Sequence, residues 1–90
     1  MSIKYLLEDI KDYEREVRSL KFDIEYYQAQ VKLFKHKAKT EREDKFYKRA
    51  MTELANEYTE KCVGFRSTLA IAERNLRVAK LRLKRYFEEV

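Results

Sequence analysis

The sequence predicts an all-α protein, a long antiparallel helical hairpin with coiled-coil-like packing. Proline is absent and glycine occurs once, so residues that interrupt helices are nearly missing. Charged residues make up 41% of the chain and apolar residues 44%, a mixture typical of long amphipathic helices. Apolar residues also recur at alternating steps of three and four, the heptad pattern of a coiled coil. The length of 90 residues fits one domain, 1–90.

The first helix is predicted at about residues 3–38. Its seam combines β-branched residues at the first heptad position with Leu or aromatic residues at the fourth. Its members are Ile3, Leu6, Ile10, Tyr13, Val17, Leu20, Ile24, Tyr27, Val31 and Phe34. Ala38 fits the next position, but charged residues occupy the two after it, Glu41 and Lys45. The seam therefore ends near residue 38.

A turn is predicted at about residues 39–40, with the second helix starting at about 41. Lysines before the turn suit the carboxyl end of a helix. The segment "TERED", residues 40–44, has the spacing of a capping box, in which Thr40 would accept from the amide of Glu43 and Glu43 would reach back. One unbroken helix is the alternative, because no Gly or Pro forces a break.

The second helix is predicted at about residues 41–90. Its seam begins with Tyr47, Met51, Leu54, Tyr58 and Cys62, where two successive steps of four form a stutter. From there it is regular through Phe65, Leu69, Ala72, Leu76, Ala79, Leu83, Tyr86 and Val90. Gly64 inside a helix costs about 1 kcal/mol relative to alanine, so a bend or break near 64 is the alternative to a continuous helix.

Folding the second helix back on the first gives a predicted register. In it Ile10 faces Ala72, Leu6 faces Leu76 and Ile3 faces Ala79. The residues after Ala79 would then extend roughly 16 Å beyond the first helix without a partner. Excess apolar surface usually means contact with another protein, so we expect a homodimer that forms a four-helix bundle. Exposure of individual apolar residues is the alternative. The expected interface comprises Leu83, Tyr86, Phe87, Val90, Leu81, Val78, Ile71, Tyr26 and Leu33.

No catalytic, cofactor-binding or metal site is predicted, and the protein is not expected to be an enzyme. His36 is a lone histidine between lysines at a helix end, and Cys62 falls on the seam, where a free thiol packs as a small apolar side chain. Metal-binding and phosphate-loop motifs are missing from the sequence. We therefore expect no cofactor and no small-molecule substrate.

The formal net charge is +5, and basic residues gather in two zones. Residues 74–85 hold six Lys or Arg and no acidic residue, and residues 32–39 hold a second group. Either zone could contact phosphate or an acidic partner, although a helical projection spreads these side chains around the surface. The candidate contacts are Arg74, Arg77, Lys80, Arg82, Lys84, Arg85, Lys35, Lys37 and Lys39.

The sequence favours a non-catalytic protein-interaction module, a small basic helical regulator, adaptor or inhibitor that binds a larger protein through helical surface. The alternative is a nucleic-acid-binding dimer that uses the basic residues at the hairpin ends. "KLRLKRYF", residues 80–87, resembles an interfacial membrane helix, but it continues the heptad, so membrane binding is not expected. With no signal peptide and no run of eighteen apolar residues, we expect a cytoplasmic location.

Overall fold

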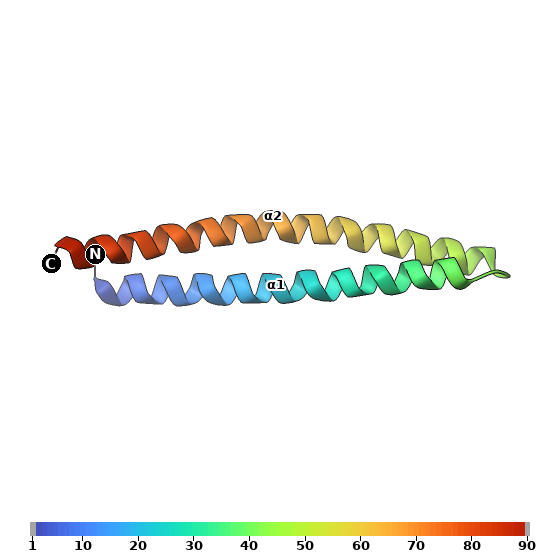
Figure 1. Ribbon diagram of the computed structural model, residues 1–90, viewed down its shortest axis with the longest axis horizontal. Helices are drawn as coiled ribbons and strands as arrows, with labels where there is room; N and C mark the ends of the chain where they lie inside the picture. Colours follow the sequence, from blue (N-terminus) through green and yellow to red (C-terminus); the bar gives the residue numbers. More distant parts are fainter. Residues whose placement is uncertain (1, 90) are drawn as a thin grey trace.

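The computed structural model describes residues 2–89 as two long antiparallel helices, which confirms the all-α hairpin. Helix α1 spans Ile3–Thr40 and helix α2 spans Lys45–Glu89. The two helices lie side by side in a rod of 71 × 14 × 14 Å, with the connection at one end and both ends of the chain at the other (Figure 1). Helix α2 continues through Gly64, so the alternative of a break there is wrong.

The connection between the helices comprises residues 41–44 and lies later than predicted. Thr40 still belongs to α1, and its hydroxyl donates to the carbonyl of His36 at 3.0 Å. Asp44 caps α2 instead, since its carboxylate accepts from the backbone N–H of Tyr47 at 3.0 Å. The predicted capping box between Thr40 and Glu43 is therefore wrong. Thr40 and Asp44 are both good capping residues, and the chain uses the second of them.

The core of the hairpin is asymmetric. On α1 the buried side chains are mostly large: Leu6, Ile10, Val17, Leu20, Ile24 and Ala38. On α2 they are small: Ala55, Cys62, Ala72 and Ala79. Larger residues of α2, among them Phe65, Leu69 and Leu76, are half-buried and pack against the centre of the seam. Small residues on one helix let the large residues of the other approach closely.

The register of the two helices differs from the predicted one by a heptad. Ala72 packs in one cluster with Val17 and Leu20, seven residues further along α1 than the predicted partner Ile10. The ring of Tyr27 stacks on that of Phe65, with 5.3 Å between the ring centroids. The cause is the later connection. When the turn moves one residue along the chain, the residue of α2 that faces a given residue of α1 lies two positions later.

The stutter predicted near Tyr58 is also wrong. Ala55 is 2% exposed, whereas Leu54 is only half-buried. With Ala55 in the seam, the steps from Met51 to Cys62 alternate as four, three and four. The prediction placed Leu54 in the seam because it is larger than the neighbouring Ala55, although the alanine faces α1.

The predicted unpartnered extension of α2 after Ala79 is contradicted by this register. Leu83 and Tyr86 are half-buried, and Tyr86 lines a groove together with Leu6 of α1. The end of α2 therefore packs against the beginning of α1. Val90 lies outside the described residues.

Candidate interaction surfaces

The two sides of the seam form two different long flanks. The seven positions of each heptad are named a to g, and the seam consists of the a and d positions. Ile10 of α1 and Cys62 of α2 each occupy an a position. In an antiparallel pair, positions b and e of both helices lie on one side of the seam, and positions c and g on the other. A groove along the rod confirms this grouping, because all its lining residues outside the seam occupy b or e positions: Gln28, Lys32 and Lys35 of α1, and Thr59, Val63 and Arg66 of α2.

Five exposed large apolar side chains occupy c positions, and we call them the apolar flank. They are Tyr5, Tyr26, Leu33, Ile71 and Val78. Four of the five belong to the predicted interface. Tyr5 was missing from it, although it occupies the same heptad position as Tyr26. In the observed register the two α2 residues lie along the rod between Tyr5 and Tyr26, so apolar side chains recur about once per heptad.

The other predicted interface residues are placed elsewhere. Leu83 and Tyr86 belong to the seam, as described above. Leu81 is exposed at an f position on the back of α2, and Phe87 is exposed at an e position on the opposite flank. Exposed Leu7, Phe22, Phe46 and Val63 lie off the apolar flank and were not in the predicted interface.

Aromatic rings connect the apolar flank to the seam. The ring of Tyr26 meets the edge of Tyr27 at 5.4 Å, and Tyr27 contacts Tyr58 at 5.2 Å, both measured between centroids. The ammonium of Lys61 lies 4.9 Å from the Tyr58 centroid. Such contacts hold rings in fixed orientations. Tyr26 is thus a positioned aromatic side chain that remains 52% exposed.

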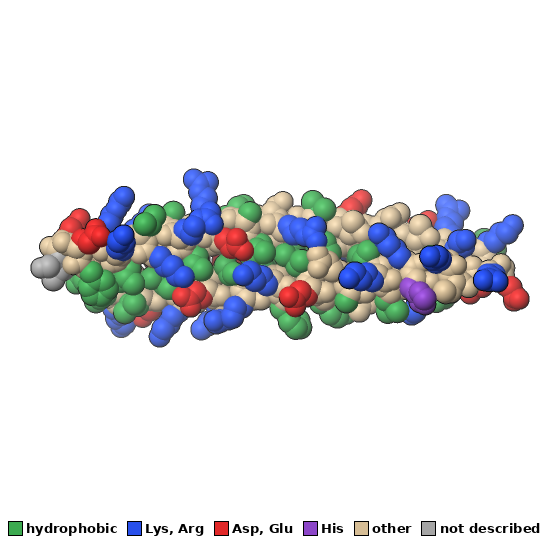
Figure 2. All heavy atoms as spheres, viewed as in Figure 1, with side chains coloured by type: hydrophobic (Ala, Val, Ile, Leu, Met, Phe, Trp, Pro, Cys, Tyr) green, Lys and Arg blue, Asp and Glu red, His purple; other side chains and the backbone are tan. Residues whose placement is uncertain are grey.

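Thirteen exposed Lys and Arg side chains occupy the b and e positions, and we call them the basic flank. They are Lys4, Lys11, Arg18, Lys21, Lys32, Lys35, Lys39, Lys45, Arg49, Arg66, Arg77, Lys80 and Lys84. The acidic residues at these positions within the helical hairpin are Glu14, Glu25 and Glu73. Figure 2 views this side of the rod and shows basic side chains over both helices along its length.

The basic flank revises the prediction of two basic zones at the hairpin ends. Arg77, Lys80, Lys84, Lys35 and Lys39 lie on it. The other predicted contacts, Arg74, Lys37, Arg82 and Arg85, occupy c, f or g positions and point to other sides of the rod. Most members in the middle of the rod, such as Arg18 and Arg66, were missed. The heptad position of each basic residue can be read from the sequence. The basic residues of the two helices form one flank only when the helices pair antiparallel.

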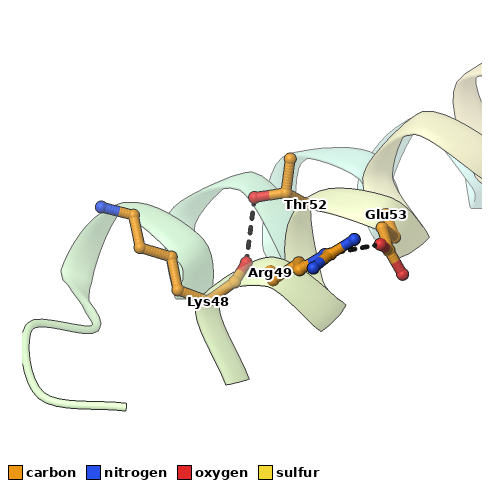
Figure 3. Close-up of polar contacts among 4 residues, drawn as sticks. All are labelled: Lys48, Arg49, Thr52 and Glu53. Carbon is orange, nitrogen blue, oxygen red and sulfur yellow. Dashed lines mark hydrogen bonds and ion pairs between the residues drawn. The ribbon is translucent and has the colours of Figure 1, made fainter. Parts of the chain in front are cut away.

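Ion pairing neutralises little of the basic flank. Within residues 2–89 the salt bridges are Arg49–Glu53 at 3.2 Å and Lys84–Glu88 at 4.0 Å. Figure 3 shows the first of them at the start of α2, beside the hydroxyl of Thr52, which donates to the carbonyl of Lys48 at 2.9 Å. Exposed pairs of this kind contribute little. The remaining eleven basic side chains keep their charge available to an anion.

Chemistry-bearing groups are few in the part of the chain described. No group of three His, Cys, Asp or Glu in residues 2–89 is placed to hold a metal ion. Cys62 is a free thiol, 4% exposed in the seam. In the connection, the carboxylate of Glu41 accepts from the N–H of Asp44 at 3.0 Å and of Glu43 at 3.1 Å, which lowers the pKa of Glu41 below its ordinary value.

Neither α1 nor α2 contains a segment that is both long and apolar enough to span a bilayer. Comparison of the chain with protein-family models, with curated proteins and with solved structures finds no match.

Proposed function

We propose that the protein is a non-catalytic interaction module, a small basic helical regulator, adaptor or inhibitor that acts through helical surface. The apolar flank carries this proposal. Large apolar side chains from both helices gather on the same side of the rod, and one of them, Tyr26, packs edge to face with the ring of Tyr27. Exposed tyrosine and aliphatic side chains around an oriented aromatic residue are typical of protein interfaces.

The first partner we propose for the apolar flank is a second copy of the chain, which would complete a four-helix bundle. Charge supports one arrangement. At the c and g positions on this side of the seam, the first half of α1 carries the acidic residues Asp9, Asp12, Glu16 and Asp23. At the same positions, residues 61–85 of α2 include Lys61, Arg82 and Arg85 and no acidic residue, while Glu57 and Glu89 lie before and after this stretch. Placing α1 of one copy against α2 of the other brings opposite charges together, and placing α1 against α1 would oppose like charges.

A larger protein partner would use the surface that such a bundle leaves free. The backs of the helices, at f positions, carry exposed Phe22, Phe46 and Leu81. Phe46 is 88% exposed beside the connection, at the end of the rod away from the chain ends. These residues are the proposed contacts for a regulatory or adaptor partner.

The molar mass in solution tests the self-association. We expect light scattering to give twice the chain mass at low and at high salt, because the proposed contact is mainly apolar. Ile71→Asp on the apolar flank should give the mass of one chain. Val63→Asp is the matched control, since Val63 and Ile71 are β-branched residues of α2 with 58% and 61% exposure, and they occupy opposite flanks.

A mass of one chain for the unchanged protein would contradict the dimer. A dimer that survives Ile71→Asp but dissociates with Val63→Asp would place the contact on the basic flank instead. Circular dichroism of both variants should show unchanged helix content, since neither substitution touches the seam.

A further inference from the structure

We propose that the basic flank binds the phosphate backbone of double-stranded nucleic acid without reading its sequence. This second binding surface does not depend on the proposed self-association, because it occupies the opposite side of the rod. A bundle formed through the apolar flanks would leave both basic flanks facing outwards.

The geometry of the basic flank matches an extended polyanion. Its members on α1 run from Lys4 to Lys39, about 50 Å along the helix axis. Six more from α2 line the same side, so positive charge borders the groove from both helices. Double-stranded DNA carries one negative charge per ~1.7 Å of its axis. A straight rod laid along or across a duplex would therefore meet several phosphates.

The side-chain chemistry points to backbone contact. Nine of the thirteen members are lysines, which act as mobile point charges, and the four arginines are Arg18, Arg49, Arg66 and Arg77. The polar uncharged residues of the groove, Gln28 and Thr59, are few. Phosphate contacts of this kind fix position and supply affinity but carry no sequence information.

The composition of the basic flank also distinguishes a duplex from other anions. Single strands are held by aromatic residues that stack on bases, and the exposed aromatic side chain described on this flank, Phe87, lies at the end of α2. Interfacial membrane helices insert large apolar residues next to their basic ones. Here most exposed apolar residues lie off the basic flank, so we favour the duplex.

The decisive experiment compares two double variants of the full chain with equal net charge. Arg18→Gln with Arg66→Gln removes two members of the basic flank. Arg15→Gln with Arg74→Gln removes two exposed arginines at f positions, which belong neither to the basic flank nor to the proposed dimer contact. Binding to a labelled DNA duplex of about 25 base pairs, longer than the rod, would be followed by fluorescence anisotropy over a salt series.

We expect the unchanged protein to bind with an affinity that falls steeply as salt rises. The basic-flank variant should lose about tenfold in affinity, and its slope of log K against log salt should become shallower by about 2, since each of the two lost phosphate contacts contributes about 0.9. The control variant should stay within about threefold of the unchanged protein, because its arginines face away from the duplex.

Several outcomes would overturn the proposal. Equal losses in both variants would mean that net charge, and not the basic flank, governs binding. No duplex binding at low salt would remove the site altogether. Equal or tighter binding to a single strand of the same length would contradict the choice of a duplex. Preferred binding to vesicles containing phosphatidylserine would assign the basic flank to a membrane surface.

Discussion

Two carboxylates of the connection determine where the hairpin turns. Glu41 accepts from the two backbone N–H groups that follow it in the connection, and Asp44 caps the first turn of α2. An N-cap satisfies a backbone donor that the helix itself cannot pair. The turn position therefore depends on two polar side chains, neither of which belongs to the apolar pattern.

Replacing Asp44 tests the cap. We expect Asp44→Ala to lower the free energy of unfolding by about 1 kcal/mol, because the N–H of Tyr47 loses its acceptor. Glu43→Ala is the control, since the Glu43 carboxylate makes no hydrogen bond within residues 2–89. Urea unfolding followed by circular dichroism measures both. Equal effects of the two substitutions would show that Asp44 has no special role.

The Glu41 carboxylate should make stability depend on pH. Its pKa is lowered, chiefly by the N–H of Asp44 and then by that of Glu43, so the folded state favours the charged form. The stabilisation is present above the ordinary pKa of a glutamate and is lost as pH falls through the lowered folded pKa. Urea unfolding of the protein and of Glu41→Gln should therefore differ at neutral pH and converge in acid. A constant difference across this pH range would contradict the account.

A substitution at Gly64 should raise the free energy of unfolding, whereas Asp44→Ala should lower it. A Cβ built at this position meets no atom within 4 Å, and α2 is regular there. We expect Gly64→Ala to raise the free energy of unfolding by roughly 0.5–1 kcal/mol, because alanine loses less backbone entropy in a helix. Thermal unfolding would show it. A loss of stability would mean that another backbone approaches Gly64 closely in solution.

At the scale of secondary-structure elements, the sequence predicted the two helices but not the register in which they pair. The alternation of three- and four-residue steps identified both seams, and the absence of Pro with only one Gly excluded most interruptions. The seam has no buried polar or charged residue among those described, so nothing within it distinguishes one heptad offset from the next. The offset follows from the connection, where Thr40 and Asp44 were competing caps.

Paired cysteines would test the register. In a Cys62→Ala background, cysteines at positions 17 and 72 should form a disulfide under mild oxidation, because Val17 and Ala72 pack in the same cluster. Cysteines at positions 10 and 72 should not, since they would lie a heptad apart. Mobility on a non-reducing gel after dilution to low concentration reports the intramolecular bond. The reverse result would restore the register first predicted from the sequence.

At the scale of the whole molecule, the residues of both flanks were visible in the sequence but their grouping was not. Ile71, Val78, Tyr26 and Leu33 are recognisable as apolar residues outside the seam. They lie on one side of the rod because the c positions of two antiparallel helices fall on the same side of the seam, which is known only once the pairing is known. The basic flank depends on the same step, which joins lysines of α1 to arginines of α2. Leu83 and Tyr86 were expected to extend beyond α1, and their half-buried place beside the beginning of α1 depends on the register.

The rod should also gain stability from association. It buries only a narrow seam, and two-helix proteins of this size are marginal alone. If the second copy covers the apolar flank, mass action predicts that the melting temperature rises with protein concentration. Scanning calorimetry or circular dichroism over a hundredfold range of concentration would measure it. A melting temperature independent of concentration would show that the single hairpin is the folding unit.

Both ends of the chain lie at the same end of the rod, and the connection lies about 70 Å away. A force that separates the two ends would therefore not shear the helices past one another. It would peel them apart layer by layer, starting at Tyr86 and the beginning of α1 and reaching the capped connection last. Such unzipping loads one layer of side chains at a time, so the rod should yield at low force. It should close again readily when the tension is released, because the connection keeps the helices together.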